Sequence, residues 1–372
     1  MKYPSPQRLK EISIASVFLV IVIAVVSLIT PYRTSPEYLL FDSSKTTTQQ
    51  SFLRAEVVKV EDDTISAKLL DSLNKGTTVT IESNDDTTQQ RVHEGSIVTL
   101  QQNQDQSFAF YDTYRVPAII ILAALFVLAV AFTGRGRGLM SLAGLAASVL
   151  IIVGVTIPLL IRGWDSFWVT VGSAYLIAIV SVILAHGLRR QTYISLACIL
   201  CVLTFVALAS TLLIFILGLT GIVDEASYSL QARSSAINLS GVLTGGIVIA
   251  TLGALDDVVT TQVATVAQIY SVNKKLTRTQ VYSRAIAVGG EHIAALVNTL
   301  ALVYVGASLP LVVVYSMYFN DPIAFLNTGF IATELTRTLI VSTALVLSVP
   351  FSTWLATKAI IVRSADNNTS NQ

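Results

Sequence analysis

Charged side chains are scarce in this chain of 372 residues. Asp, Glu, Lys and Arg together make up 13% of it, whereas 53% of it is hydrophobic. Soluble domains carry roughly 25% charged residues. So low a charge content, combined with several long apolar runs, excludes an ordinary soluble protein. It predicts an integral membrane protein whose helices cross a lipid bilayer several times.

The residue patterns of enzymes and of nucleic-acid-binding proteins are also missing. There is no Walker pattern or other Gly-rich phosphate loop, and no block of Lys and Arg that would bind a phosphate backbone. The two cysteines, Cys198 and Cys201, lie inside an apolar segment, and we interpret them as small packing residues. We therefore expect no enzymatic activity, no cofactor and no nucleic-acid partner.

The first apolar run covers residues 12–30, follows a basic N-terminal end and stops at Pro31. Its length is close to the roughly 20 residues that cross a bilayer. A cleaved signal peptide is the alternative, but the run lacks a clear small-x-small cleavage site. We therefore favour a transmembrane anchor over residues 1–31, with its basic end in the cytoplasm.

Residues 32–112 differ from the rest, because they contain short segments in which polar and apolar residues alternate. A period of two predicts antiparallel strands, and about five such strands predict a small OB-like barrel or sandwich. We interpret His93 as an exposed turn residue, since no second His or Cys stands at metal-ligand spacing. The alternating segments are 54–60, 64–70, 77–82 and 96–101.

Seven further apolar runs are long enough to cross a membrane: 116–133, 139–161, 167–186, 193–219, 240–270, 285–318 and 335–362. The predicted fold class is therefore an α-helical integral membrane protein with about eight transmembrane helices. A small extracytoplasmic β domain would separate the first helix from the second. Residues 113–363 would form a seven-helix membrane domain, and the polar residues 364–372 a disordered cytoplasmic tail.

Basic residues accumulate on alternate connections between these runs. By the positive-inside rule, this bias predicts a plasma-membrane protein with both termini in the cytoplasm and the β domain outside it. We interpret the outer segment 221–238 either as an interfacial helix or as a solvated connector. The basic inner connections hold Arg135, Arg137, Arg189, Arg190, Lys274, Lys275, Arg278 and Arg284.

A specific residue pattern occupies residues 250–310. It consists of Leu252-Gly-Ala-Leu-Asp-Asp-Val258, Gly290-Glu-His-Ile293, Val297-Asn-Thr-Leu-Ala-Leu-Val-Tyr304 and Gly306-Ala-Ser-Leu-Pro310. This pattern resembles the YibE/F family of multi-pass membrane proteins, and the resemblance extends over about residues 50–362. It implies the architecture and a candidate site, but no substrate. Many members have an apolar residue at position 256, so Asp257 matches the family pattern better than Asp256.

The two adjacent carboxylates Asp256 and Asp257 interrupt the apolar run at 240–270. An ionisable residue in lipid is costly and is therefore a functional candidate. At 1.5 Å per residue, Asp257 lies about 25 Å from residue 240, and Glu291 lies about 28 Å from Pro310 in the next, antiparallel helix. We therefore predict that the carboxylates share one layer in the inner half of the membrane.

Helical spacing adds further polar side chains to this predicted layer. A ladder of carboxylate, hydroxyl and amide groups suits protons or hard cations. Alternatively, the aspartates cap a helix or pair with nearby basic residues, and Gln262 and Asn298 hold helices together. The candidate ion-path residues are Asp256, Asp257, Thr261, Gln262, Glu291, His292, Asn298 and Tyr304.

Two further spacings predict local contacts. Glu334 and Arg337 are three residues apart and should form an ordinary ion pair at the outer start of the last helix. Gly241 and Gly245 have the GxxxG spacing that allows helices to pack closely and that also drives dimerisation.

Two functional hypotheses follow. The first is a transporter or permease for a small solute or ion, which uses the polar layer between the sixth and seventh helices. The second is a membrane-embedded structural or assembly protein whose external β domain binds a partner. The expected partners are the lipid bilayer, a small solute or ion, and either a second copy of the chain or an extracytoplasmic protein.

Overall fold

The computed structural model describes residues 51–61, 64–71, 75–82, 92–103, 107–234, 237–318 and 321–369. The predicted anchor at 12–30 lies outside these residues. The described chain forms two compact units that part between Arg135 and Gly136.

The first unit contains one five-stranded antiparallel sheet. Its strands are β1 (Ser51–Val60), β2 (Thr64–Leu69), β3 (Thr78–Glu82), β4 (Ile97–Gln102) and β5 (Phe108–Thr113). The strand order is β3-β2-β1-β4-β5, so β1 is central and pairs with both β2 and β4. The strand prediction is therefore confirmed, and the fifth strand ends at Thr113, just past the predicted boundary at residue 112.

The sheet curls into a half-barrel around a cluster of buried apolar residues on its inner side. The buried positions of β2 alternate with partly exposed ones, as a two-residue period requires. The edge strands β3 and β5 approach each other, which nearly closes the barrel. The apolar interior is formed by Ala55, Val57, Ile65, Ala67, Leu69, Ile81, Val92, Val98 and Leu100.

The helices are α3 (Val116–Ile151), α4 (Ile157–Ile161), α5 (Ser166–His186), α6 (Arg190–Ile216), α7 (Glu225–Arg233), α8 (Leu239–Val272), α9 (Arg278–Ala307), α10 (Leu309–Tyr318), α11 (Pro322–Leu326) and α12 (Gly329–Thr369). A π-helical turn, η3 (Ile152–Thr156), joins α3 to α4. Seven helical stretches of the described chain are long and apolar enough to cross a membrane, and they overlap the seven runs after the anchor. The run predicted over 285–318 is divided, because α9 ends at Ala307 and α10 follows.

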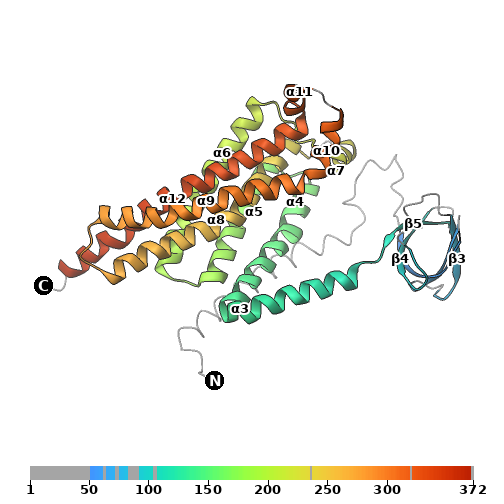
Figure 1. Cartoon of the computed structure of the whole chain (residues 1–372), viewed down its shortest axis with the longest axis horizontal. Coiled ribbons are helices and arrows are strands. Elements are labelled where there is room, and N and C mark those ends of the chain that lie inside the picture. The colour runs from blue at the N-terminus through green and yellow to red at the C-terminus, as the bar shows by residue number, and fades with distance from the viewer. Residues whose placement is uncertain are drawn as a thin grey trace, which may run out of the picture. The chain divides into compact units, whose positions relative to one another are not determined.

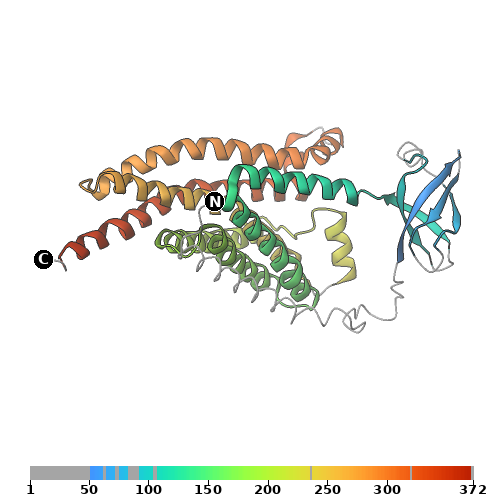
Figure 2. The same cartoon turned by 90° about the horizontal axis from the view of Figure 1, so that it is seen from below.

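The second unit is a bundle of long helices arranged around α8. Helix α8 contacts α5, α6, α9 and α12, and both views show these helices side by side (Figures 1 and 2). The short helices α7, α10 and α11 lie at one end of the bundle. The guanidinium of Arg190 donates to the carbonyl of Ala359, which places the start of α6 beside the late part of α12 at the opposite end.

Close packing between α5 and α8 follows from the absence of side chains at two glycines. A Cβ at Gly241 would lie 3.0 Å from the Ser166 Cβ, and a Cβ at Gly245 would overlap the Thr170 side chain. The GxxxG prediction of close packing is thus confirmed. The glycine face of α8 packs against α5 of the same chain. Both contacts join residues 75 positions apart, so α5 and α8 run parallel and in constant register.

Helix α12 contains Pro350 in its interior. Proline removes one backbone hydrogen bond, and membrane helices tolerate it where hydroxyl side chains bond to the freed backbone region. Here Ser348 donates to the Leu345 carbonyl, and Ser352 and Thr353 both donate to the Val349 carbonyl.

The end of α12 differs from the sequence prediction. The polarity of residues 364–372 predicts a disordered tail, but the helix continues to Thr369. Extending a formed helix costs far less than nucleating one, and Ala365 follows the apolar run with a strong helix former. Residues 370–372 lie outside the described part of the chain.

The contact between α5 and α8 can be tested with two adjacent glycines. Gly245→Ala should lower the stability of the detergent-solubilised protein by about 1–3 kcal/mol, because the new methyl group overpacks the interface. Gly246→Ala is the matched control, since a Cβ there meets no atom within 4 Å. Thermal unfolding followed by circular dichroism measures both. Equal melting temperatures for the two variants would contradict this packing.

Candidate functional site

The Asp256 carboxylate lies between α8 and α5. The Ser181 hydroxyl donates to Asp256 Oδ2 over 3.3 Å. Asp256 Oδ1 is buried and accepts no hydrogen bond from any described residue. His186, the last residue of α5, is close enough to act on this carboxylate electrostatically. A buried carboxylate with an unused acceptor is a place where a proton or a cation can bind.

A line of hydroxyl side chains on α5 leads to this carboxylate. Ser166, Thr170, Ser173 and Ser181 follow one helical stripe, and the first three are buried. Ser166 and Thr170 touch the glycines of α8, and Ser181 bonds Asp256 at the same 75-residue offset. The Ser166 hydroxyl, like Asp256 Oδ1, is buried and has no partner among the described residues. The stripe therefore carries hydroxyl groups near its start and again at Asp256, with the buried apolar Ile177 between Ser173 and Ser181.

Gln262 joins three helices at a second buried position. Its Nε2 donates to the Ala285 carbonyl of α9 over 2.9 Å and to Thr353 Oγ1 of α12 over 2.7 Å. Gly289 of α9 makes room for this contact, because a Cβ there would lie 2.5 Å from Val349 and 3.0 Å from the Gln262 amide oxygen. Gln262 therefore fits the interpretation that it holds helices together.

The described structure does not form the polar layer predicted between α8 and α9. Asp257 and Thr261 lie on the exposed stripe of α8, and Glu291, His292 and Asn298 lie on the exposed face of α9. The reason is rotation: adjacent residues of a helix differ by about 100°, so Asp256 faces the bundle while Asp257 faces away from it. Of the eight candidates, Asp256 and Gln262 reach into the bundle with a hydrogen bond to another helix.

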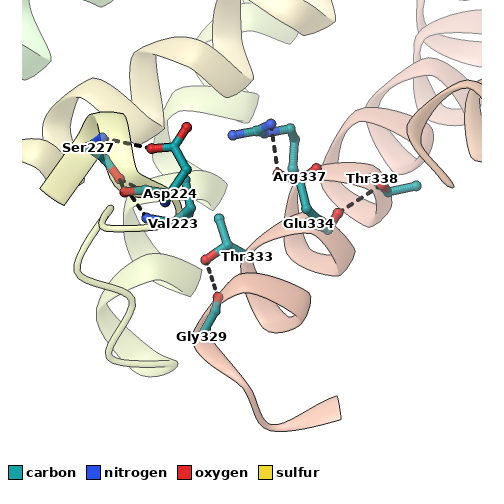
Figure 3. A network of polar contacts seen from close by, with 8 residues as sticks. All are labelled: Val223, Asp224, Ser227, Gly329, Thr333, Glu334, Arg337 and Thr338. Atoms are coloured by element: carbon teal, nitrogen blue, oxygen red, sulfur yellow. Dashed lines mark hydrogen bonds and ion pairs between the residues drawn. The ribbon is translucent and has the colours of Figure 1, made fainter. Parts of the chain in front are cut away.

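A separate group of polar residues, with Glu334 and Arg337 at its centre, lies at the other end of the bundle (Figure 3), and Tyr304 is near it. Arg337 and Glu334 form the predicted ion pair over 3.0 Å, although both side chains are partly buried. Tyr304 is close enough to interact electrostatically with both of them. Arg337 Nε is buried and lacks a described partner.

Asp224 lies at the start of α7, near the Glu334–Arg337 ion pair. Its carboxylate accepts a hydrogen bond from the Ser227 backbone amide over 2.7 Å and so caps α7. Hydrogen bonding by Ser227 holds the pKa of Asp224 below its ordinary value, and the charge of Arg337 acts in the same direction. The segment 221–238 thus contains a capped helix.

Sequence reasoning missed the partners of the buried polar groups. Ser181 and Thr353 are ordinary hydroxyl residues in apolar runs, and they stand far along the chain from Asp256 and Gln262. His186 was interpretable only as a residue at a helix end. The one available signal is the common offset of 75 residues, which becomes visible once the GxxxG pair is assigned to a partner helix.

The role of Gln262 is tested by comparison with a second glutamine of α8. Gln262→Leu leaves the Ala285 carbonyl and the Thr353 hydroxyl without this donor, so it should destabilise the protein by about 1–2 kcal/mol. Gln268→Leu, at an exposed position, should have little effect. Thermal unfolding in detergent measures the difference, and a Gln262→Leu protein as stable as the wild type would refute the three-helix contact.

Comparison with known proteins assigns the helical unit to a family. A family model described as YibE/F-like protein matches residues 122–361. This range contains the bundle and excludes the β half-barrel, so the resemblance expected from about residue 50 is confirmed over 122–361. No curated protein and no solved structure matches the chain. The matched range is more than half of the sequence, and the chain therefore belongs to the YibE/F-like protein family.

Proposed function

We propose that this protein is a permease that moves a small solute or ion across the plasma membrane and uses Asp256 to bind a proton or a cation. The observation that carries the proposal is the Asp256 carboxylate itself. It lies inside an apolar helix bundle, bonds one hydroxyl and keeps a buried oxygen without a partner among the described residues. Proteins keep such costly groups in membrane segments mostly for transport or proton transfer.

The surroundings of Asp256 support a binding event at this carboxylate. The Ser181 hydroxyl both donates and accepts hydrogen bonds, so it accommodates a protonated as well as an ionised carboxyl. His186 lies close enough to act on this carboxylate electrostatically. Its position at the end of α5 provides a route from that end of the bundle to Asp256.

The hydroxyl stripe of α5 supports access from the other end. Ser166 starts the stripe beside the loop that holds Asp165, and Thr170 and Ser173 continue it. Gly241 and Gly245 leave no side chain of α8 between the first two residues of this stripe, Ser166 and Thr170, and the α8 backbone. We infer that small movements of α5 against α8 open Asp256 alternately to the two sides.

The charge distribution supports an orientation for this transport. One end of the bundle holds basic residues on the connections between α5 and α6 and between α8 and α9, whereas the other end holds Asp165, Asp224 and Asp321. By the positive-inside rule, we propose that the basic end faces the cytoplasm. Both termini would then be cytoplasmic, and the half-barrel would be extracytoplasmic.

The experiment compares two adjacent aspartates. Purified protein is reconstituted into liposomes that contain a pH-sensitive dye, and proton flux is recorded under gradients of pH, Na⁺, K⁺ and Mg²⁺. Asp256→Asn keeps the size of the side chain but removes its charge, so flux should fall to the level of empty liposomes. Asp257→Asn, on the exposed stripe, should retain at least about half of the flux, because this side chain faces away from the interior of the bundle.

The same preparations control for folding. Thermal unfolding of both variants should remain within a few degrees of the wild type. Wild-type flux in a correctly folded Asp256→Asn protein would refute the role of Asp256. Wild-type liposomes that match empty ones under every gradient would count against the permease itself.

A second candidate function rests on the half-barrel. Phe52 and Tyr111 are both exposed, and their ring centroids lie 4.7 Å apart. Neighbouring exposed aromatic residues are enriched where proteins bind one another. We propose that this pair binds an extracytoplasmic protein and that the membrane helices hold the half-barrel in place.

A pair of substitutions tests this second candidate. Phe52→Ser with Tyr111→Ser should abolish proximity labelling of the partner by the full-length protein, because the aromatic anchor is gone. Val58→Ser, at another exposed apolar position, is the control and should leave labelling unchanged. An identical set of labelled proteins for the double variant and the wild type would exclude the aromatic pair as the binding surface.

A further inference from the structure

Helix α9 presents an uncovered face along a membrane-crossing length. Its candidate span, Arg278–Ala307, has far fewer buried residues than the span of α8. The fully buried residues of α9 are Val281, Ala285 and Gly289, all in its first half. From position 290 onward the helix touches the bundle on one side only, and the opposite side is exposed.

The exposed face carries two polar stripes. Glu291 and Asn298 are seven residues apart and share one stripe, and His292 and Thr299 share the next. The side chains of Glu291, His292 and Asn298 make no hydrogen bond or ion pair with any described residue; Thr299 donates to the Ala295 carbonyl, which leaves its acceptor lone pairs free. Ala295 lies between the stripes, so only a short side chain separates them.

This face is unsuited to lipid. A carboxylate and an amide in a membrane helix are costly unless they find polar partners, and the side chains of Glu291 and Asn298 have none within the part of the chain that the structure describes. The GxxxG pair cannot recruit another chain, because α5 already occupies Gly241 and Gly245. The polar face of α9 therefore needs a cover of matching chemistry.

We propose that this cover is α9 of a second copy of the chain, packed parallel to the first around a twofold axis along the membrane normal. In a parallel pair of helices related by a twofold axis, the stripe on one side of Ala295 faces the stripe on the other side of Ala295 in the second copy. Glu291 then meets His292 of the second copy, and Asn298 meets Thr299 of the second copy, each twice. Acid meets base and amide meets hydroxyl, while Ala295 lets the helices approach closely.

The exposed stripe of α8 does not offer the same match. It contains Gly253, Asp257 and Thr261 and no basic residue. A twofold axis through it would bring the Asp257 carboxylates of the two copies together without a counter-charge, which is unfavourable in a membrane. Charge complementarity thus selects α9 over α8.

The first experiment measures the oligomeric state of the full-length protein in detergent by light scattering across a dilution series. The wild type should be a dimer. Glu291→Lys places a cation against His292 of the second copy and should weaken the dimer about tenfold or more. The exchange variant Glu291→His/His292→Glu restores an acid opposite a base and should recover most of the affinity. The control Ala250→Leu, on the exposed stripe of α8, should dimerise normally.

The second experiment uses disulfide crosslinking in membranes and does not depend on detergent. Replacing Cys198 and Cys201 by alanine removes both native cysteines. Ala295→Cys in this background should then form a species of twice the chain mass on oxidation, and Ala250→Cys should not. A protein that stays monomeric at every concentration, or a dimer indifferent to Glu291→Lys, would overturn the proposal. So would an Ala295→Cys that fails to crosslink, or that crosslinks to a different protein.

Discussion

The close approach of α5 and α8 is the constraint on which the bundle depends. Lipid tails are as apolar as leucine, so helices in a bilayer gain little by hiding apolar surface from one another and associate through close contact instead. Gly241 and Gly245 permit that contact, because their backbone lies directly against Ser166 and Thr170. The same register brings Ser181 to Asp256. Packing and chemistry therefore use one interface, and a change in the spacing of these two helices alters both.

Much of the fold is readable from the sequence because it depends on local properties. The length of an apolar run determines whether a helix can cross a bilayer, and the seven runs after residue 112 all appear as candidate spans. Alternation at a period of two is equally local, and it places the strands of the half-barrel. The Glu334–Arg337 pair is confirmed because its spacing on a helix suffices to bring the charges together.

The candidate site is less readable, because it depends on which way each helix faces. Helix α8 is apolar around most of its circumference, so its sequence holds no strong polarity that would orient Asp256 and Asp257. Counting along the helix gives their depth but not their direction. Ser181 and Thr353 pair with residues far along the chain, and nothing in a single sequence connects such positions. The sequence predicts Glu291 and Asn298 in the interior, because charged and polar groups in lipid are costly. A partner that covers them from outside the bundle removes the same cost.

Pro350 has a mechanical consequence for the whole bundle. Helix α12 lacks a backbone hydrogen bond at this proline and is therefore softest there. Directly beside it, Val349 presses on Gly289 of α9, and Thr353 accepts from Gln262 of α8. The soft point is thus fixed to two neighbours. A tilt of the end that carries Arg337 would be taken up by bending at Pro350, while the end that carries Lys358 stays in place.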